Sequence, residues 1–145
     1  MIVLALDPGK ITGWAVPEHS GTFYLELRGD TKLPRPVRHG GWFARARDFL
    51  DSTIDAYRVE VVVIEHQPVI RGSGSLVTLG LRAVFLEVAW SRSLMVDEVS
   101  SSQWQSWARG YGWKKVPSAN GGDEIDAAAL LQWWLAVQLP KVRAA

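Results

Sequence analysis

The residues Ile2-Val-Leu-Ala-Leu-Asp7-Pro8-Gly9 open the sequence with an apolar run that stops at an acidic side chain and a turn. Short runs of aliphatic and β-branched residues are typical of buried strands, and Asp-Pro-Gly is typical of a turn. We therefore expect a strand that ends at Asp7. Because an ionised carboxylate beside a hydrophobic core is costly unless it is paired or binds a cation, Asp7 is also a candidate functional residue.

The rest of the chain predicts further strands and helices around this first strand. Two antiparallel strands are expected over 12–16 and 22–27, separated by Pro17 and Gly21, and a loop over 33–41, which contains two prolines and two adjacent glycines. Apolar residues at helical spacing predict helices over 42–57 and 76–90, runs typical of strands lie at 59–64 and 94–99, and a short helix follows Ser100 to Ser102. A last helix is expected over 123–138. This order predicts one α/β domain over 1–145, a mixed sheet with helices packed on it.

Three more acidic residues border apolar elements in the same way as Asp7. Glu65 follows the buried run 61–64, and Asp123 and Asp126 begin the last helix. Residues three apart on a helix are separated by about 60° around its axis, so these two aspartates share a face. If the strands before Asp7 and Glu65 are parallel neighbours, their carboxyl ends bring these two side chains together. Taken singly, each acid has an ordinary structural explanation, as a turn residue, a solvated side chain or a partner of the helix dipole.

Four carboxylates at one place would bind hard cations. Oxygen ligands without cysteine suit Mg²⁺ or Mn²⁺, and two such ions about 3.5–4 Å apart would form the arrangement that hydrolyses phosphodiesters. One ion would activate the attacking water and the other would stabilise the leaving 3′ oxygen. The pattern thus indicates a nuclease.

Composition excludes several other classes of protein. The 145 residues include no cysteine, which excludes thiolate zinc sites, iron–sulfur clusters, a cysteine nucleophile and disulfides, and is compatible with a reducing compartment. We expect a cytoplasmic protein, since no basic residue precedes the first apolar run as in a signal peptide. The apolar stretch 127–139 is shorter than the roughly 20 residues that span a bilayer, so no membrane partner is expected.

The charge distribution is consistent with a nucleic-acid partner. The net charge is only +1, but five of the 15 acidic residues belong to the motifs above or lie between them. When these five are set aside, the rest of the chain contains 16 basic and 10 acidic residues. A basic body around an acidic pocket would hold phosphates outside and cations inside.

The motifs together resemble the RuvC family of Holliday-junction resolvases. The opening strand with Asp7-Pro8-Gly9 and the following Thr12-Gly13-Trp14 resembles the start of that family, and Val-Val-Val-Ile-Glu65 resembles its second acidic strand. Leu79-Gly80 and the closing Asp123-Glu-Ile-Asp126-Ala-Ala-Ala-Leu are similar to its later motifs. The resemblance spans residues 1 to about 134. It implies an RNase H-like fold, a homodimer, and Mg²⁺-dependent nicking of branched DNA, preferentially four-way junctions, with Asp7, Glu65, Asp123 and Asp126 as catalytic metal ligands.

The sequence departs from this family in its DNA-contacting segments. The segment 109–122 is shorter than in bacterial members, and the position that resembles a family lysine is Gln105, so Lys114 or Lys115 is expected to substitute for it. An aromatic wedge of the family is replaced by Pro68, with Ile70 nearby as another apolar residue that could unstack bases. Arg71 and Arg109 are candidate phosphate contacts. His66 and Glu124 are possible auxiliary residues, although a histidine beside a strand is more often a hydrogen-bonded neighbour. This drift resembles bacteriophage relatives, which would act in the infected bacterial cell.

Two alternatives stay open from the sequence. One is a less selective nuclease that acts on forks, flaps or RNA–DNA hybrids. The other is a junction-binding protein with weak or lost turnover, an alternative suggested by Gln105 and the short segment after it. The helix predicted over 76–90 carries apolar residues outside its main stripe, which favours a partner helix in a dimer.

Overall fold

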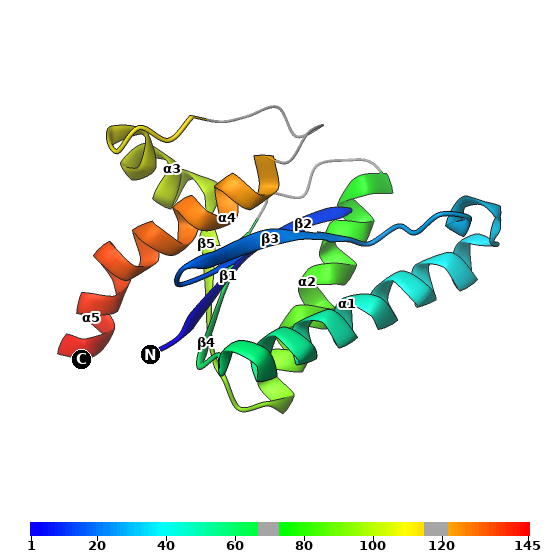
Figure 1. Ribbon diagram of the computed structural model, residues 1–145, viewed down its shortest axis with the longest axis horizontal. Helices are drawn as coiled ribbons and strands as arrows, with labels where there is room; N and C mark the ends of the chain where they lie inside the picture. The colour runs from blue at the N-terminus through cyan, green and yellow to red at the C-terminus, as the bar shows by residue number, and fades with distance from the viewer. Residues whose placement is uncertain (67–72, 115–121) are drawn as a thin grey trace.

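Five strands form one mixed sheet at the centre of the molecule (Figure 1). The computed structural model describes residues 1–66, 73–114 and 122–145, with the side chains of 73–75, 122 and 123 excepted. The strands are β1 (Val3–Asp7), β2 (Ile11–Val16), β3 (His19–Tyr24), β4 (Val61–His66) and β5 (Met95–Ser100), and their order across the sheet is β3-β2-β1-β4-β5. β1 pairs with β2 antiparallel and with β4 parallel. The predicted mixed sheet is confirmed, and the condition under which Asp7 and Glu65 come together, that their strands are parallel neighbours, is met.

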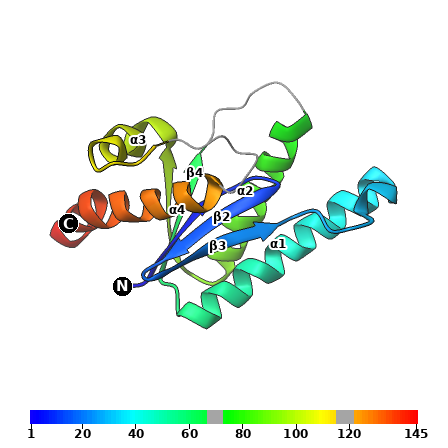
Figure 2. The same ribbon diagram turned by 45° about the horizontal axis from the view of Figure 1, so that its top comes forward.

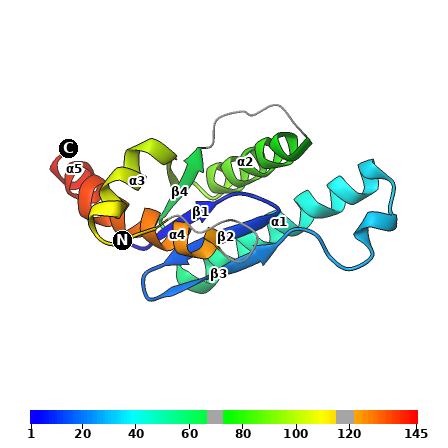
Figure 3. The same cartoon turned by 90° about the horizontal axis from the view of Figure 1, so that it is seen from above.

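Helices cover both faces of this sheet. One face carries α1 (Arg35–Tyr57) and α2 (Ser73–Ser91), and the other carries α3 (Ser101–Gly110), α4 (Gly122–Trp133) and α5 (Leu139–Ala144). A π-helical turn, Trp134–Gln138, joins α4 to α5. Figure 2 and Figure 3 show the same division from two further directions. Within the described ranges, no helix has the length and apolar character needed to cross a membrane.

The two central strands divide their side chains between these faces. Leu4 and Leu6 of β1 belong to the core under α1 and α2, whereas Val3 and Ala5 belong to the core under α3 and α4. All residues of β1 are buried, which agrees with its almost continuous apolar sequence. Successive residues of a strand point to opposite faces, so the face of any residue in β1 or β4 follows from its position.

The prediction of a loop over 33–41 is wrong. Helix α1 begins at Arg35, with Pro34 as its N-cap residue and Pro36 in its first turn. Proline is tolerated there because the first helical turn leaves its N–H groups without partners inside the helix. The two glycines that suggested a loop lie inside the helix, at a cost of roughly 1 kcal/mol each relative to alanine. Tertiary packing of the helix on the sheet overrides this local preference.

The third strand also begins earlier than predicted. The turn lies at Pro17 and Glu18, where Glu18 has a φ of 70°, and Gly21 is part of β3 instead of preceding it. A Cβ atom on Gly21 would lie 2.9 Å from the Trp14 ring, which packs against this glycine from β2. Gly21 therefore serves close packing between two strands, where the sequence suggested a break.

Candidate active site

Asp7 and Glu65 end up side by side at the carboxyl ends of β1 and β4. The two strands pair in parallel with Leu6 opposite Ile64, so the next residue on each strand is one of these acids. Adjacent strands lie about 4.8 Å apart. Alternation along each strand directs both side chains to the face covered by α3 and α4, because Ala5 and Val63 point there. Both residues are buried, at 4% exposure for Asp7 and 5% for Glu65.

Helix α3 provides a hydrogen-bond donor to Glu65. The hydroxyl group of Ser101, the first residue of α3, donates to Oε1 of Glu65. The start of this helix is fixed by Ser100, whose N–H donates to Oε1 of Gln103 at 2.8 Å. This reciprocal cap places Ser101 directly after β5, the strand next to β4. The hydrogen bond from Ser101 therefore orients the Glu65 carboxylate.

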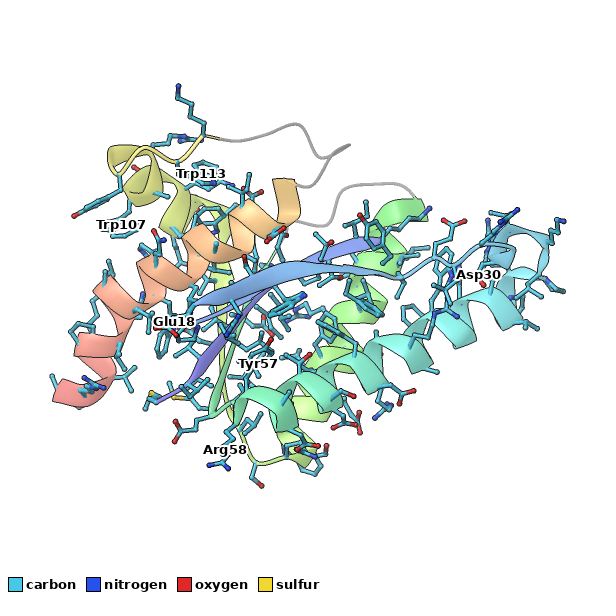
Figure 4. The ribbon with its side chains drawn as sticks, viewed as in Figure 1. Glu18, Asp30, Tyr57, Arg58, Trp107 and Trp113 are labelled. Atoms are coloured by element: carbon cyan, nitrogen blue, oxygen red, sulfur yellow. The ribbon has the colours of Figure 1, made fainter. Side chains whose placement is uncertain are left out.

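The segment after α3 contacts another of the four candidate acids, Asp126 on α4. Nε1 of Trp113 donates to Oδ1 of Asp126 at 3.1 Å. The Trp113 ring packs edge-on against the buried Trp104 at a centroid distance of 4.9 Å, and the Arg109 guanidinium lies 5.8 Å from its centroid. Figure 4 shows Trp113 beside α4. An indole that is packed and hydrogen-bonded in this way fixes the orientation of the Asp126 carboxylate.

Glu124 links α4 to the sheet. Its Oε1 accepts a hydrogen bond from the Ser20 hydroxyl of β3 at 2.8 Å. α4 packs against β1 and β2 and, through this contact, against β3. Glu124 thus has a structural role at the first turn of α4. Asp123 also lies in this turn, and its side chain is outside the described part of the structure.

The described carboxylates fit a hard cation to a limited extent. Mg²⁺ is commonly held by one or two carboxylates together with substrate phosphates, and Asp7 and Glu65 are two adjacent, buried oxygen donors of this kind. Among the side chains described in 1–66, 76–114 and 124–145, no three His, Asp or Glu residues form a group that could hold a metal ion. The structure therefore brings two of the four predicted ligands together, and places Asp126 on the same side of the sheet.

The remaining predicted residues fall into three groups. Alternation places His66 on the face opposite Asp7 and Glu65, with its Nδ1 buried and without a hydrogen-bond partner. Arg109 and Lys114 are exposed at and after the end of α3, on the same side of the sheet as the acids. Pro68, Ile70, Arg71 and Lys115 lie outside the described residues.

Ser101 and Trp113 are the contacts that sequence reasoning missed. Ser101 was expected only as a possible cap residue, and Trp113 only as an aromatic residue near basic ones. Knowledge that β5 adjoins β4 would have placed Ser101 near Glu65. No signal in the sequence connects Trp113 with Asp126.

Comparison with solved structures identifies the fold. RuvC of Thermus thermophilus in complex with a Holliday junction substrate superposes with a TM-score of 0.62 at 17% identity, covering 94% of this chain and 95% of that one. The chain has the RuvC fold. A second structure of Thermus thermophilus RuvC gives 0.60 at 16% identity, covering 95% of this chain and 97% of that one. The yeast mitochondrial Holliday junction resolvase Ydc2 gives 0.61 at 12%, covering 92% and 80%.

The similarity to these proteins is seen in the three-dimensional structure and not in sequence searches. No protein-family model and no curated protein matches the sequence. The RNase H-like mixed sheet that the sequence predicted is confirmed by the RuvC structures. Asp7 and Glu65 occupy, within this fold, the carboxyl ends of its two central parallel strands.

Proposed function

We propose that this protein is a metal-dependent endonuclease that nicks branched DNA, preferentially four-way junctions. The observation that carries the proposal is the pair of buried carboxylates, Asp7 and Glu65, on neighbouring parallel strands of a RuvC fold. Two adjacent acids repel each other when both are ionised, and a bound cation removes that repulsion. The likeness to RuvC bound to a Holliday junction supports branched DNA as the substrate.

Asp7, Glu65, Asp123 and Asp126 would hold two Mg²⁺ ions, for which Mn²⁺ could substitute. Bound there, the cations would supply Lewis-acid activation of water and stabilisation of the leaving 3′ oxygen. The chain's own contribution is positioning: Ser101 orients Glu65, and Trp113 orients Asp126. These contacts act before the substrate arrives, so the ligands need little rearrangement during the reaction.

We further propose a homodimer, with its two sites directed at opposing strands of the junction. Helix α2 exposes Leu76 to 71% and Trp90 to 80%. The two residues are 14 positions apart, which places them about 40° apart around the helix axis. Exposed apolar side chains along one stripe of a helix favour a partner surface, and a two-fold dimer would match the symmetry of a four-way junction.

The test is cleavage of a synthetic four-way junction beside a linear duplex of the same sequence. With Mg²⁺, we expect nicking of the junction to be much faster than nicking of the duplex, and chelation of the metal should stop both. Equal rates would indicate a less selective nuclease, and tight binding without nicking would indicate a junction-binding protein. Asp7→Asn is the matched inactive control, because it exchanges one buried oxygen ligand for an amide of the same shape.

A further inference from the structure

A basic cavity lies between α1 and α2, on the face of the sheet opposite α4. Its volume is about 400 Å³, and its lining combines Lys10, Arg35, Arg38 and His39 with the apolar or small residues Trp42, Phe43, Leu76, Val77 and Gly80. Leu76 of α2 also belongs to the surface proposed above for the dimer, so the pocket lies at the margin of that surface. We call it the Trp42 pocket. Among the described residues that line it, Glu26 is the one acid, so the three Lys and Arg side chains give it a net positive charge.

Trp42 organises two of these cations. Lys10 Nζ and the Arg38 guanidinium each lie 5.6 Å from the centroid of the Trp42 ring. At this distance a cation is attracted by the aromatic ring. Trp42 itself is 3% exposed. The ring therefore acts as a buried support that holds both charges at the pocket.

A buried carboxylate fixes the Trp42 ring in turn. Oδ2 of Asp30 accepts hydrogen bonds from Nε1 of Trp42 at 2.8 Å, from the N–H of Leu27 at 2.8 Å and from Nη2 of Arg45 at 2.6 Å. Arg45 also donates to the carbonyl of Leu25 at 2.6 Å. These bonds join the loop before α1 to the helix itself and fix the position of the Trp42 ring at the pocket.

The pocket retains unused donor capacity. Nε of Arg38 is buried and has no hydrogen-bond acceptor. A buried N–H without an acceptor is destabilising, and a charged donor more so. An anion bound in the pocket would satisfy this donor. Planar guanidinium groups are well suited to phosphate oxygens.

One residue that lines the pocket, Lys10, is close to the candidate active site along the chain. Lys10 follows Asp7 by three residues, so their Cα atoms are at most about 11 Å apart. One DNA strand advances about 3.4 Å along the helix axis for each nucleotide, so this distance corresponds to about three nucleotides. A strand with its scissile phosphate at Asp7 would bring neighbouring phosphates within reach of Lys10, which lines the Trp42 pocket.

We propose that the Trp42 pocket binds phosphates of the DNA backbone within a few nucleotides of the nick. This inference rests on the proposed function, because it needs DNA at the adjacent site. The ligand group is a phosphate and not a base, because the buried Trp42 ring has no free face on which a base could stack. The cations of Lys10 and Arg38 already lie against this ring. The pocket would add affinity and set the path of the strand, without taking part in the chemistry.

The decisive experiment is the salt dependence of junction binding, measured without divalent metal. The double variant Arg35→Gln/Arg38→Gln is compared with wild type and with the control Lys141→Gln/Arg143→Gln. The control removes two exposed charges from α5, which lies at the opposite end of the molecule from the start of α1 (Figure 1). Circular dichroism and thermal unfolding check that all three proteins are folded.

Loss of two phosphate contacts should make the negative slope of log K against log salt shallower by about 1.8. Between 50 and 200 mM salt, wild-type affinity should therefore fall about twelvefold more than that of the pocket variant. The α5 control should keep the wild-type slope. A pocket variant with the wild-type slope overturns the proposal, and so does one that changes only the oligomeric state in sedimentation, which would make the pocket a subunit interface.

Two further arms separate the possible sources of failure. Inorganic phosphate should displace DNA from wild type better than chloride at equal ionic strength, and the pocket variant should lose this difference. The same displacement with an unchanged DNA slope would reassign the pocket to a free phosphate. Wild-type protein that binds the junction but never nicks it with Mg²⁺ would refute the proposed function, while the slopes would still decide the pocket. Wild-type protein that binds no DNA would refute both.

The absence of cysteine allows an independent measurement. Arg35→Cys introduces a unique thiol at an exposed position of the pocket, which can be cross-linked to DNA carrying one thiol-tethered phosphate at successive positions. Cross-linking should peak within about three nucleotides of the nick. Yields no higher than those of Arg143→Cys at every position would overturn the proposal.

Discussion

Buried acids occur in two parts of this molecule, and their surroundings differ. Asp30, in front of α1, faces three donors from the protein, and one of them is the cation of Arg45. Asp7 and Glu65 instead lie beside each other, and the donor to Glu65 from α3 is the neutral hydroxyl of Ser101. The Asp30 carboxylate is thus bound into the packing of α1, whereas Asp7 and Glu65 bring two acidic side chains together, and a cation bound between them would reduce their mutual repulsion.

The largest difference is expected when one acid of each kind is neutralised. Asp7→Asn should abolish nicking of the junction, by more than the roughly 10–100-fold loss that follows removal of an outer partner of a metal ligand. It should leave DNA binding unchanged or tighter, because it removes a negative charge near phosphate. Rates and binding are measured on the same junction, with and without Mg²⁺.

Asp30→Asn is the counterpart of this variant. It should lower the melting temperature, because the cation of Arg45 loses its partner, while nicking per folded molecule changes little. A stable but inactive Asp30→Asn protein, or an active Asp7→Asn protein, would reverse the roles that we assign to the two regions.

Metal binding should separate the two regions without any measurement of activity. A ligand that binds only the folded state stabilises it by about 2.7 kcal/mol at 100 times its dissociation constant. Mg²⁺ should therefore raise the melting temperature of wild type and of Asp30→Asn, and should have little effect on Glu65→Gln. An equal rise in all three proteins would place the bound metal away from Glu65.

A smaller effect is expected from the indole that orients Asp126. Trp113→Phe keeps the edge-on packing on Trp104 but removes the hydrogen bond to the carboxylate. We expect the Mg²⁺ concentration for half-maximal thermal stabilisation to rise by about 10–100-fold. Trp107→Phe is the matched control, since the Trp107 ring of α3 packs tilted against Tyr111 at a centroid distance of 4.4 Å. Equal responses of the two variants would limit Trp113 to packing.

The fold was largely predictable from the sequence because its strongest signals are local. The apolar runs before Asp7 and Glu65 are too continuous for a half-exposed strand, and both proved to be central strands. The proximity of the two acids followed from these runs only on the assumption that the two strands are parallel neighbours. The start of α1 was not predictable in this way, because Pro34, Pro36 and two glycines suggest a loop until the packing of the helix is known.

The contacts that orient the acids were hidden for a different reason. The bond from Ser101 to Glu65 spans 36 residues, and the bond from Trp113 to Asp126 spans 13. Neither follows from periodicity or from spacing within one element. Asp30 was overlooked because an acid after a glycine is typical of a turn, and its partners Trp42 and Arg45 belong to a helix that was predicted to begin later.

The smallest expected effect concerns acid denaturation and the Asp30 region. The Leu27 N–H, with Trp42 and Arg45, lowers the pKa of Asp30 below its ordinary value of 3.8. The pKa of Glu60 is lowered as well, by the N–H of Ile2 and the terminal ammonium group. A carboxyl group whose pKa is depressed by folding stabilises the protein above its unfolded pKa, and this contribution is lost as the pH falls through the folded value.

The difference in melting temperature between wild type and Asp30→Asn should thus be constant from pH 7 to about 5 and should narrow below about pH 4. Thermal scans at half-unit pH steps measure this difference. A gap that stays constant down to pH 3 would mean that the Asp30 carboxylate is not the group whose ionisation joins α1 to the preceding loop.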